Sequence, residues 1–361
     1  MNKRILHLIN SLDNGGCERM LLRTLPHLTG FEHYLLTLKQ RGSLSARFEE
    51  EGLNVRQIKN IFKLRSSVNN LSPDLVITYL FHADFVGRIL VQPLSKIKVI
   101  PFLRTTYNFP RYWPARLFDQ FTSPLVNHYF ANSTAVRDYY ISKLQVHKSK
   151  ITVIPNGIDP NIYSRSKSLR SKYRRNFGFG QKDVVFIDVA NLHPNKGHKH
   201  LLIAFDKLFN RHKNIGLLLV GDGEERQALN SQAEKLQSFP KIRFLGKRDD
   251  VPSLLNCSDI YVSPTYFEGM SNALMEAMAA GLPVITTAIP ENKLLVKSGR
   301  DGLLVSVDNQ LDLKLESAMK NLMNHSAERS RLGHNAEIKI KREYSMEATV
   351  KLWSKELSFY A

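Results

Sequence analysis

The sequence predicts an α/β protein built from two doubly wound parallel sheets. Short apolar runs alternate with longer helical patterns along the whole chain. Runs such as residues 184–187 and 217–220 are apolar without alternation, which is typical of parallel strands covered by helices on both faces. The length of 361 residues suits two domains of ~150 residues each.

The expected strands fall into two successive sets, one in each half of the chain. They are residues 4–9, 35–38, 75–79, 98–103, 128–131 and 151–154, then residues 184–190, 216–220, 242–245, 260–263, 283–287 and 303–305. The first run resembles a signal peptide superficially. His7 interrupts its apolar residues, Asn10 ends it and no small-residue cleavage site follows, so we expect a strand there.

The domain boundary is expected near residue 160. Residues 155–160 are rich in turn formers, and residues 161–182 hold seven basic residues, four serines and no acid. We interpret the basic stretch as an exposed crossover in which a helix can form, because Leu169, Tyr173 and Phe177 recur at four-residue steps.

The last segment, residues 345–357, is predicted to form an amphipathic helix. Its apolar side chains share one face at helical spacing, and Glu347 lies in the first turn, where the helix dipole favours an acid. The apolar face consists of Met346, Val350, Trp353 and Leu357.

The charge is the one unusual feature of the composition. The formal net charge is +18, and the excess is spread over both halves instead of forming a basic tail. Such a charge favours an anionic partner, which could be nucleic acid, an acidic membrane or a phosphorylated substrate. Two cysteines are too few for a disulfide framework and suit a reducing compartment. No run approaches the ~18 apolar residues of a spanning helix.

The densest functional signal follows the fourth expected strand of the second half. A helix is expected to begin near Ser271 or Asn272, which are good N-caps, and to end at Gly281. Its start lies at the carboxyl edge of a parallel sheet, where open α/β folds bind ligands and free N–H groups suit a diphosphate. Glu268 and Glu276 bracket this turn and could accept hydrogen bonds from sugar hydroxyls. Taken alone, they are equally consistent with solvated helix charges.

A second signal follows the first strand of the second half. Lys196, followed by Gly197, lies in a loop where it could neutralise a phosphate as a point charge. His193, His198 and His200 lie close by in the sequence, but their spacing matches no common zinc pattern, so no metal site is predicted.

Weaker signals follow other strands. The paired Gly15 and Gly16 would let the backbone approach a ligand closely, although they do not match a nicotinamide-binding fingerprint. His82, Arg104 and Asp222 each come just after an expected strand. An isolated residue of this kind is more often structural. Their shared position at carboxyl ends of strands favours a common cleft.

Together these residues closely resemble the retaining, nucleotide-sugar-dependent glycosyltransferases of the glycogen-synthase-like group, which build bacterial polysaccharides. The resemblance covers nearly the whole chain, and its core is the E-x7-E motif of that family. The matching motifs are Gly15-Gly16-Cys17-Glu18, residues 153–159, Lys196-Gly197, Leu245-Gly246 and Glu268-x7-Glu276.

The resemblance implies two facing Rossmann-like domains, the GT-B fold, with the donor held mostly by the second. Residues 1–160 would form the acceptor-binding domain and residues 161–344 the nucleotide-sugar-binding domain. The C-terminal helix, within residues 345–361, would cross back to the first domain.

The resemblance also implies a role for each matched residue. Glu276 would bind the ribose hydroxyls and Lys196 the diphosphate, while Glu268 would hold the donor sugar. The implied donor-binding set is Gly16, Asn191, Lys196, Gly246, Glu268, Gly269, Met270, Ser271, Asn272 and Glu276. Gly15 and Arg104 would lie on the acceptor side, and the catalytic candidates are Glu268, His82 and Lys196.

One position departs from the family pattern. The family often has arginine in place of Asn191, which cannot neutralise charge. Lys196 and helix N-termini would therefore carry more of that task, or Arg104 or another base would contribute.

The implied activity is retaining transfer of a sugar from a nucleoside-diphosphate sugar, UDP- rather than GDP-, to a glycan or lipid-linked glycan of a cell-surface polysaccharide. The departing diphosphate would take the acceptor proton, with no cofactor and no metal required. Two alternatives remain: a nucleotide-sugar epimerase of the same fold, and a non-catalytic polyanion-binding protein. Nucleic acid is not expected as a partner, since no basic helix interleaved with aromatics, RNP-like strand or zinc finger occurs.

The remaining positive charge suggests a location. Arg111 and Arg116 lie in an aromatic-rich stretch of the acceptor domain, which suits docking on an anionic membrane. The expected location is therefore cytoplasmic and peripheral, at the inner face of the cell membrane. The aromatic residues concerned are Phe109, Tyr112, Trp113 and Phe118.

Overall fold

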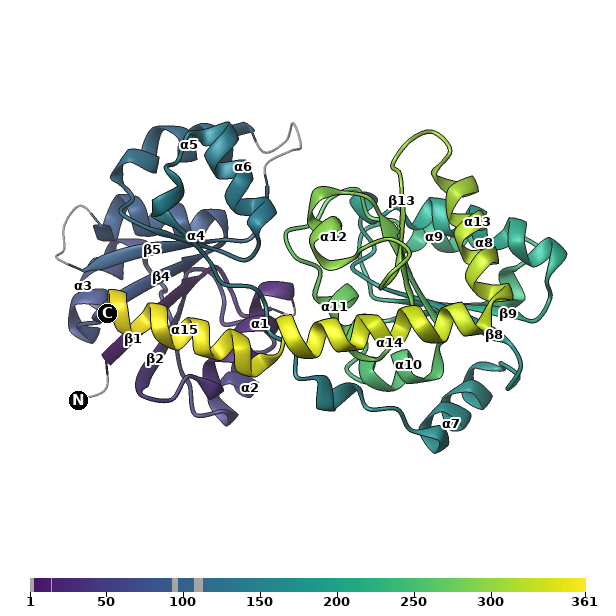
Figure 1. Ribbon diagram of the computed structural model, residues 1–361. Helices are drawn as coiled ribbons and strands as arrows, with labels where there is room; N and C mark the ends of the chain where they lie inside the picture. Colours follow the sequence, from purple (N-terminus) through teal and green to yellow (C-terminus); the bar gives the residue numbers. More distant parts are fainter. Residues whose placement is uncertain (1–2, 14, 93–96, 107–112) are drawn as a thin grey trace. The chain divides into compact units, whose positions relative to one another are not determined.

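The computed structural model describes residues 3–13, 15–92, 97–106 and 113–361. The chain divides into two compact units: unit 1 holds Met1–Gly157 and Met346–Ala361, and unit 2 holds Ile158–Ser345. The division therefore lies a few residues before the expected boundary at residue 160. Each unit is a parallel sheet flanked by helices, which confirms the predicted α/β fold class (Figure 1).

Unit 1 has a seven-stranded parallel sheet with the order β3-β2-β1-β4-β5-β6-β7. One of its strands, β3, was not predicted from the sequence. It is a short edge strand in which only Val55 is buried, so its polar residues mask the apolar pattern of a strand. The strands are β1 (Lys3–Ile9), β2 (Phe31–Thr37), β3 (Asn54–Gln57), β4 (Leu75–Tyr79), β5 (Lys98–Leu103), β6 (Tyr129–Ala131) and β7 (Ile151–Val153).

The helices of unit 1 include the C-terminal helix, which returns to this unit as predicted. Trp353 packs its ring edge-on against Phe102 and Phe130, with centroids 5.3 and 5.5 Å away, which anchors that helix on the sheet. The helices are α1 (Gly16–Thr24), α2 (Ser45–Glu50), α3 (Leu64–Leu71), α4 (Leu80–Val86), α5 (Trp113–Thr122), α6 (Thr134–Leu144) and α15 (Met346–Tyr360).

Unit 2 has a six-stranded parallel sheet with the order β10-β9-β8-β11-β12-β13. Its strands are β8 (Val184–Val189), β9 (Ile215–Val220), β10 (Ile242–Gly246), β11 (Ile260–Ser263), β12 (Val284–Thr287) and β13 (Leu303–Val305). Its helices are α7 (Lys167–Phe177), α8 (His198–Arg211), α9 (Arg226–Ala233), α10 (Val251–Cys257), α11 (Asn272–Ala279), α12 (Pro290–Leu295), α13 (Leu311–Asn324) and α14 (Ser326–Glu343).

The continuous apolar runs are the central strands of unit 2. Every residue of β9 is buried, because one hydrophobic cluster covers each face of the sheet. Cys17 and Cys257 are both free and buried, one in each unit.

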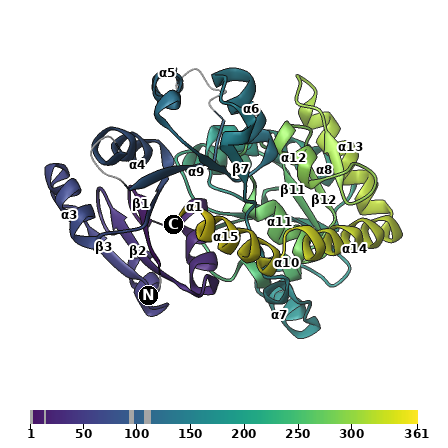
Figure 2. The ribbon, with the colours of Figure 1, turned by 60° about the vertical axis from the view of Figure 1, so that its left-hand side comes forward.

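The basic crossover forms helix α7, which lies beside α10 in unit 2 (Figure 2). Tyr173 and Phe177, two of the three apolar residues that suggested a helix, pack against the core. The expectation of an exposed crossover is wrong for Arg174, whose side chain is fully buried. Its guanidinium forms an ion pair with Asp259, which explains how a charged group can lie in the interior.

Each sheet reverses its strand order once. In unit 1 the reversal lies between β1 and β4, and in unit 2 it lies between β8 and β11. Loops that leave the carboxyl ends of these strand pairs diverge, which opens the crevice where doubly wound sheets bind ligands.

Candidate functional site

Two loops meet at the carboxyl edge of the unit 2 sheet, one after β8 and one after β11. The carbonyl oxygen of Asn195 accepts hydrogen bonds from the Tyr266 N–H at 2.8 Å and the Thr265 hydroxyl at 3.2 Å. The two loops are therefore fixed to each other at the point where the strand order reverses.

This connection brings Lys196 and Glu268 together, although they are 72 positions apart in the sequence. The Lys196 ammonium donates to Glu268 Oε1 in an ion pair, and both side chains are less than one fifth exposed. The sequence predicted both residues as part of the site but not their contact. An ammonium and a carboxylate in this position can bind a phosphate and a sugar hydroxyl, respectively.

Gly197 lets the two loops approach. Its φ is +71°, and a Cβ at this position would lie 2.3 Å from the carbonyl oxygen of Pro264. Only glycine combines a left-handed backbone with so close a backbone neighbour. The Lys-Gly pair is thus explained by backbone geometry as well as by charge.

Helix α11 begins beside this ion pair, in the segment that follows Glu268. Ser271 is its N-cap, and the Ser271 hydroxyl accepts from the Leu274 N–H at 3.3 Å, as the sequence predicted. Glu276 lies about one turn inside the helix and is only 6% exposed, so it is not a solvated surface charge. Gly269, Met270 and Asn272 complete the turn into the helix. The N–H groups at a helix start of this kind can bind an anion.

The loops after β9 and β10 lie along the same edge. Gly246 has a φ of +66°, and its carbonyl oxygen accepts from the Gly221 N–H at 2.8 Å. The Leu192 N–H donates to the Asp222 carbonyl oxygen at 3.0 Å, which places the exposed Asn191 next to this pair of loops. The structure thus gathers Asn191, Lys196, Gly246, Glu268 and Glu276 at one sheet edge.

Arg226 is a candidate site residue that the sequence did not single out. It pairs with Asp222 at 3.0 Å, and the Gly223 N–H together with Arg226 lowers the pKa of the Asp222 carboxyl. The Arg226 guanidinium lies 3.1 Å from the position that a Cβ of Gly246 would occupy. Arg226 is therefore a candidate for the positive charge that Asn191 lacks.

Glu291 is a second candidate site residue that the sequence did not indicate. It lies in the first turn of α12, is only 5% exposed, and burial raises its pKa, with the charge of Glu268 adding to the effect. Its place just after β12, behind Pro290, is the same carboxyl-edge position that identified the other candidates. A buried pair links β8 to the start of α8, where His198 Nε2 lies 3.2 Å from Asp188 Oδ2.

The unit 1 candidates form their own group after β1 and β4. Gly15 is the N-cap of α1, and a Cβ there would lie 2.4 Å from a carboxylate oxygen of Glu18. Burial raises the pKa of Glu18, and the charge of Arg104 opposes that effect. His82 lies exposed in α4, with Nδ1 3.4 Å from the Asn10 side-chain amide.

Arg104 and Gly16 complete the unit 1 set. Arg104 follows β5, and its guanidinium donates to Asn156 Oδ1 at 3.4 Å. Gly16 is the exposed first residue of α1. Leu80, two residues before His82, has a φ of +68°, which is rare for a residue with a side chain and typical of functional turns.

The described residues hold neither a candidate metal cluster nor a candidate membrane-spanning helix. No group of three or more histidine, cysteine, aspartate or glutamate side chains there could hold a metal ion. None of the helices in that part of the chain is long and apolar enough to cross a membrane.

Family models match both units. Residues 170–339 match the model for "Glycosyl transferases group 1", and residues 2–162 match the model for "Glycosyltransferase Family 4". The chain belongs to the group 1 glycosyltransferases. The resemblance drawn from the motifs is thus confirmed at the level of this family.

Curated relatives of this group 1 glycosyltransferase include two bacterial proteins. One is the UDP-Gal:alpha-D-GlcNAc-diphosphoundecaprenol alpha-1,3-galactosyltransferase of Escherichia coli, 31% identical over 48% of this chain and 46% of that protein. The matched stretch thus spans about half the length of that relative. The other is the putative glycosyltransferase EpsF of Bacillus subtilis, 22% identical over 80% of both chains.

Solved structures agree on the GT-B fold. Anabaena HepE, crystallised with UDP and glucose, superposes with a TM-score of 0.89 at 21% identity and covers 99% of each chain. WaaG, a glycosyltransferase involved in lipopolysaccharide biosynthesis, gives a TM-score of 0.78 at 18% identity, with 96% of this chain covered and 98% of WaaG. At these identities, the likeness establishes the fold.

Proposed function

We propose that this group 1 glycosyltransferase transfers a sugar, with retention, from a nucleoside-diphosphate sugar to a glycan or lipid-linked glycan of a cell-surface polysaccharide. The observation that carries the proposal is the meeting of Lys196, Glu268 and the start of α11 at the strand reversal of unit 2. UDP is favoured over GDP as the nucleotide, because HepE was crystallised with UDP-glucose and the Escherichia coli relative is named for UDP-Gal.

The proposed donor contacts follow from the chemistry of these residues. Lys196 and the N–H groups at the start of α11 neutralise the diphosphate, with Arg226 as a further positive charge. Glu276 accepts the ribose hydroxyls, and Glu268 accepts hydroxyls of the donor sugar. Gly246 frames the base. The unit 1 residues Gly15, Gly16, His82 and Arg104 serve the acceptor.

The proposed reaction is a front-face substitution. The acceptor hydroxyl attacks the anomeric carbon on the face from which the nucleoside diphosphate departs, so the anomeric configuration is kept. The bond between that carbon and the diphosphate oxygen breaks, and the departing oxygen takes the proton of the hydroxyl. Charge stabilisation and positioning supply the rate acceleration, and no step requires a metal or another cofactor.

The proposal is tested by a thermal-shift screen of UDP- and GDP-sugars, followed by a transfer assay with the donor that binds. A ligand at 100 times its Kd stabilises the fold by about 2.7 kcal/mol. We expect a UDP-sugar to raise the Tm and the glycoside product to keep the donor's anomeric configuration by NMR. An inverted product would contradict the mechanism. An epimer formed from the UDP-sugar alone would indicate the epimerase alternative.

We also propose that unit 1 docks on the anionic inner face of the cytoplasmic membrane through α5. Trp113, Leu117 and Phe121 form an outward stripe at four-residue steps and are 64, 41 and 77% exposed. Arg116 is exposed on the same helix. An apolar stripe beside positive charge matches the chemistry of an acidic bilayer surface. Phe109, Arg111 and Tyr112, which the sequence also suggested, lie outside the described residues.

The opposite face of α5 is firmly anchored, so the stripe is held in place. Phe118 packs on Phe85 with ring centroids 4.7 Å apart. Asp119 forms an ion pair at 2.7 Å with the fully buried Arg88. The residues that the sequence grouped together thus divide between an outward face and an inward face.

Trp113→Glu/Phe121→Glu is expected to weaken binding to phosphatidylglycerol vesicles at least about tenfold in co-sedimentation, because each change places a charge where an apolar ring would enter the bilayer. Phe62→Glu is the matched control, since Phe62 is a 91% exposed aromatic residue of unit 1 away from α5. Unchanged vesicle binding of the double variant would rule out α5 as the docking surface.

A further inference from the structure

A cavity lies in unit 2 at the opposite edge of the sheet from the proposed donor site. Its volume is about 450 Å³, and its wall includes Asp259 and Pro283, which directly precede β11 and β12. Glu268 and Ser271 follow β11 at its other end. The cavity therefore opens at the amino edge of the strands, separated from the donor site by the length of the strands.

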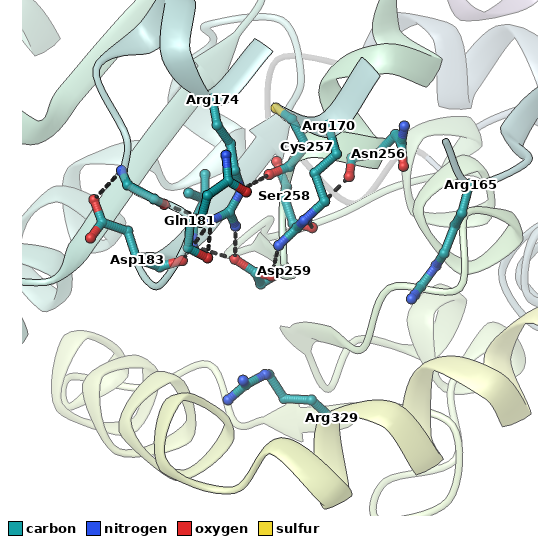
Figure 3. Close-up of polar contacts among 12 residues, drawn as sticks. Arg165, Arg170, Arg174, Gln181, Asp183, Asn256, Cys257, Ser258, Asp259 and Arg329 are labelled. Carbon is teal, nitrogen blue, oxygen red and sulfur yellow. Dashed lines mark hydrogen bonds and ion pairs between the residues drawn. The ribbon is translucent and has the colours of Figure 1, made fainter. Parts of the chain in front are cut away.

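The cavity wall is strongly basic. Arg165, Lys167 and Arg170 come from the basic crossover, and Arg329 comes from α14. Figure 3 shows the side chains of Arg165, Arg170 and Arg329. The acid among its lining residues is Asp259, which is already shared between Arg170 and the buried Arg174. Four positive side chains thus face this space against one carboxylate that is already paired. The proposed transfer reaction makes no use of this charge.

The arginines are held in place by backbone carbonyls. Arg170 Nη1 donates to the carbonyl oxygens of Asn256 at 3.1 Å and Ser258 at 2.9 Å. Arg165 Nε donates to Ala280 at 3.3 Å, and Arg329 Nη1 donates to Leu322 and Met323, both at 2.6 Å. These contacts hold the charged groups at the cavity. Ligand binding therefore costs little additional side-chain conformational entropy.

Hydroxyls and helix starts complete the wall. Ser326 and Ser330 line the cavity at the start of the 18-residue helix α14, and Ser166 caps α7 with its hydroxyl. The N-terminal ends of two helices therefore point positive partial charge toward the same space. Hydroxyls, guanidinium groups and an ammonium are the donors that bind phosphate oxygens in proteins.

We propose that this cavity is a binding site for a phosphorylated small molecule, held by its phosphate group between α7 and α14. Its volume lies within the range of small-ligand sites, about 300–1,000 Å³, and its concave wall suits a compact ligand better than an extended polymer. The phosphate could belong to a free metabolite or to a phospholipid headgroup. The site is independent of the proposed transfer reaction, because it lies at the other sheet edge.

The test is calorimetric titration with inorganic pyrophosphate in a Lys196→Ala background, which removes the phosphate-binding lysine of the donor site. Lys167→Glu reverses a positive charge and Ser330→Glu introduces a negative charge, both at exposed positions that line the cavity. Lys172→Ala is the matched control, because Lys172 is exposed on the same helix but does not line the cavity.

The expected result is 1:1 binding that each glutamate variant weakens at least about tenfold and Lys172→Ala changes less than about twofold. Absence of binding, or binding that Lys167→Glu leaves unchanged, would overturn the proposal. Circular dichroism of each variant verifies folding, and having two separate variants keeps the test decisive if one of them fails to fold.

Two further measurements distinguish the sources of the phosphate. Glycerol 3-phosphate represents a soluble metabolite, and phosphatidic acid vesicles represent a lipid headgroup. The vesicle measurement uses a Phe121→Glu background, which removes docking through α5. Binding of the soluble ester that depends on Lys167 assigns a metabolite, whereas vesicle binding alone that depends on Lys167 assigns a lipid. Vesicle and ester binding that are both insensitive to Lys167→Glu would contradict the site.

Discussion

Lys196→Ala is expected to lower kcat/KM for sugar transfer by about 100-fold or more while the chain remains folded. In the proposed mechanism negative charge develops on the departing diphosphate, and Lys196 is the cation that the structure places at the strand reversal of unit 2. The variant also leaves Glu268 without its ion-pair partner, so a carboxylate would then repel the diphosphate.

A double-mutant cycle separates these two effects. If part of the loss in Lys196→Ala comes from the unpaired carboxylate, Lys196→Ala/Glu268→Ala should lose less activity than the sum of the two single changes predicts. Lys182→Ala is the control, since Lys182 is an exposed lysine of the same unit. Near-normal transfer by Lys196→Ala would contradict the assignment of this residue.

Glu276→Ala tests the other end of the proposed donor site. Its carboxylate is buried in α11 at the proposed donor site, and we expect its removal to lower transfer about 100-fold with a parallel loss of nucleotide affinity. Glu234→Ala, at an exposed position in unit 2, should change neither quantity. A Glu276→Ala variant that binds UDP normally would show that this carboxylate does not hold the ribose.

The sequence predicted most of the fold because the central strands are buried on both faces. Runs such as β9 are apolar throughout, so their pattern is unmistakable. Edge strand β3 was not predicted, because one buried valine among polar residues gives no recognisable alternation of apolar and polar residues. The helix at Ser271 was predicted because its N-cap chemistry is local and therefore visible in the sequence.

Contacts between distant segments could not be predicted in this way. Lys196 and Glu268 were each singled out by a motif, but their ion pair depends on two loops meeting after β8 and β11. Arg226 has no motif and acquires a possible role only through its position beside Gly246. The basic cavity is assembled from four separate segments, so its charge was visible in the sequence but its concave shape was not.

Gly197→Ala is expected to reduce transfer by up to about 100-fold even though it removes no chemical group. A Cβ would lie 2.3 Å from the Pro264 carbonyl oxygen, so the loops after β8 and β11 must move apart. Those loops carry Lys196 and Glu268, and a displacement of about 1 Å in a positioning group can cost about that factor in rate. Steady-state kinetics and thermal unfolding of the variant measure both consequences.

Gly299→Ala isolates the steric part of this effect. Gly299 has nearly the same backbone, with a φ of +77°, yet a Cβ there would meet no described atom within 4 Å. Its replacement should therefore cost only the left-handed backbone penalty, about 1–2 kcal/mol in the free energy of unfolding, and leave transfer unchanged. Gly197→Ala should destabilise the fold further and impair transfer as well. Equal behaviour of the two variants would mean that glycine is needed at residue 197 for its backbone conformation alone, and that the close approach of the loops does not position Lys196.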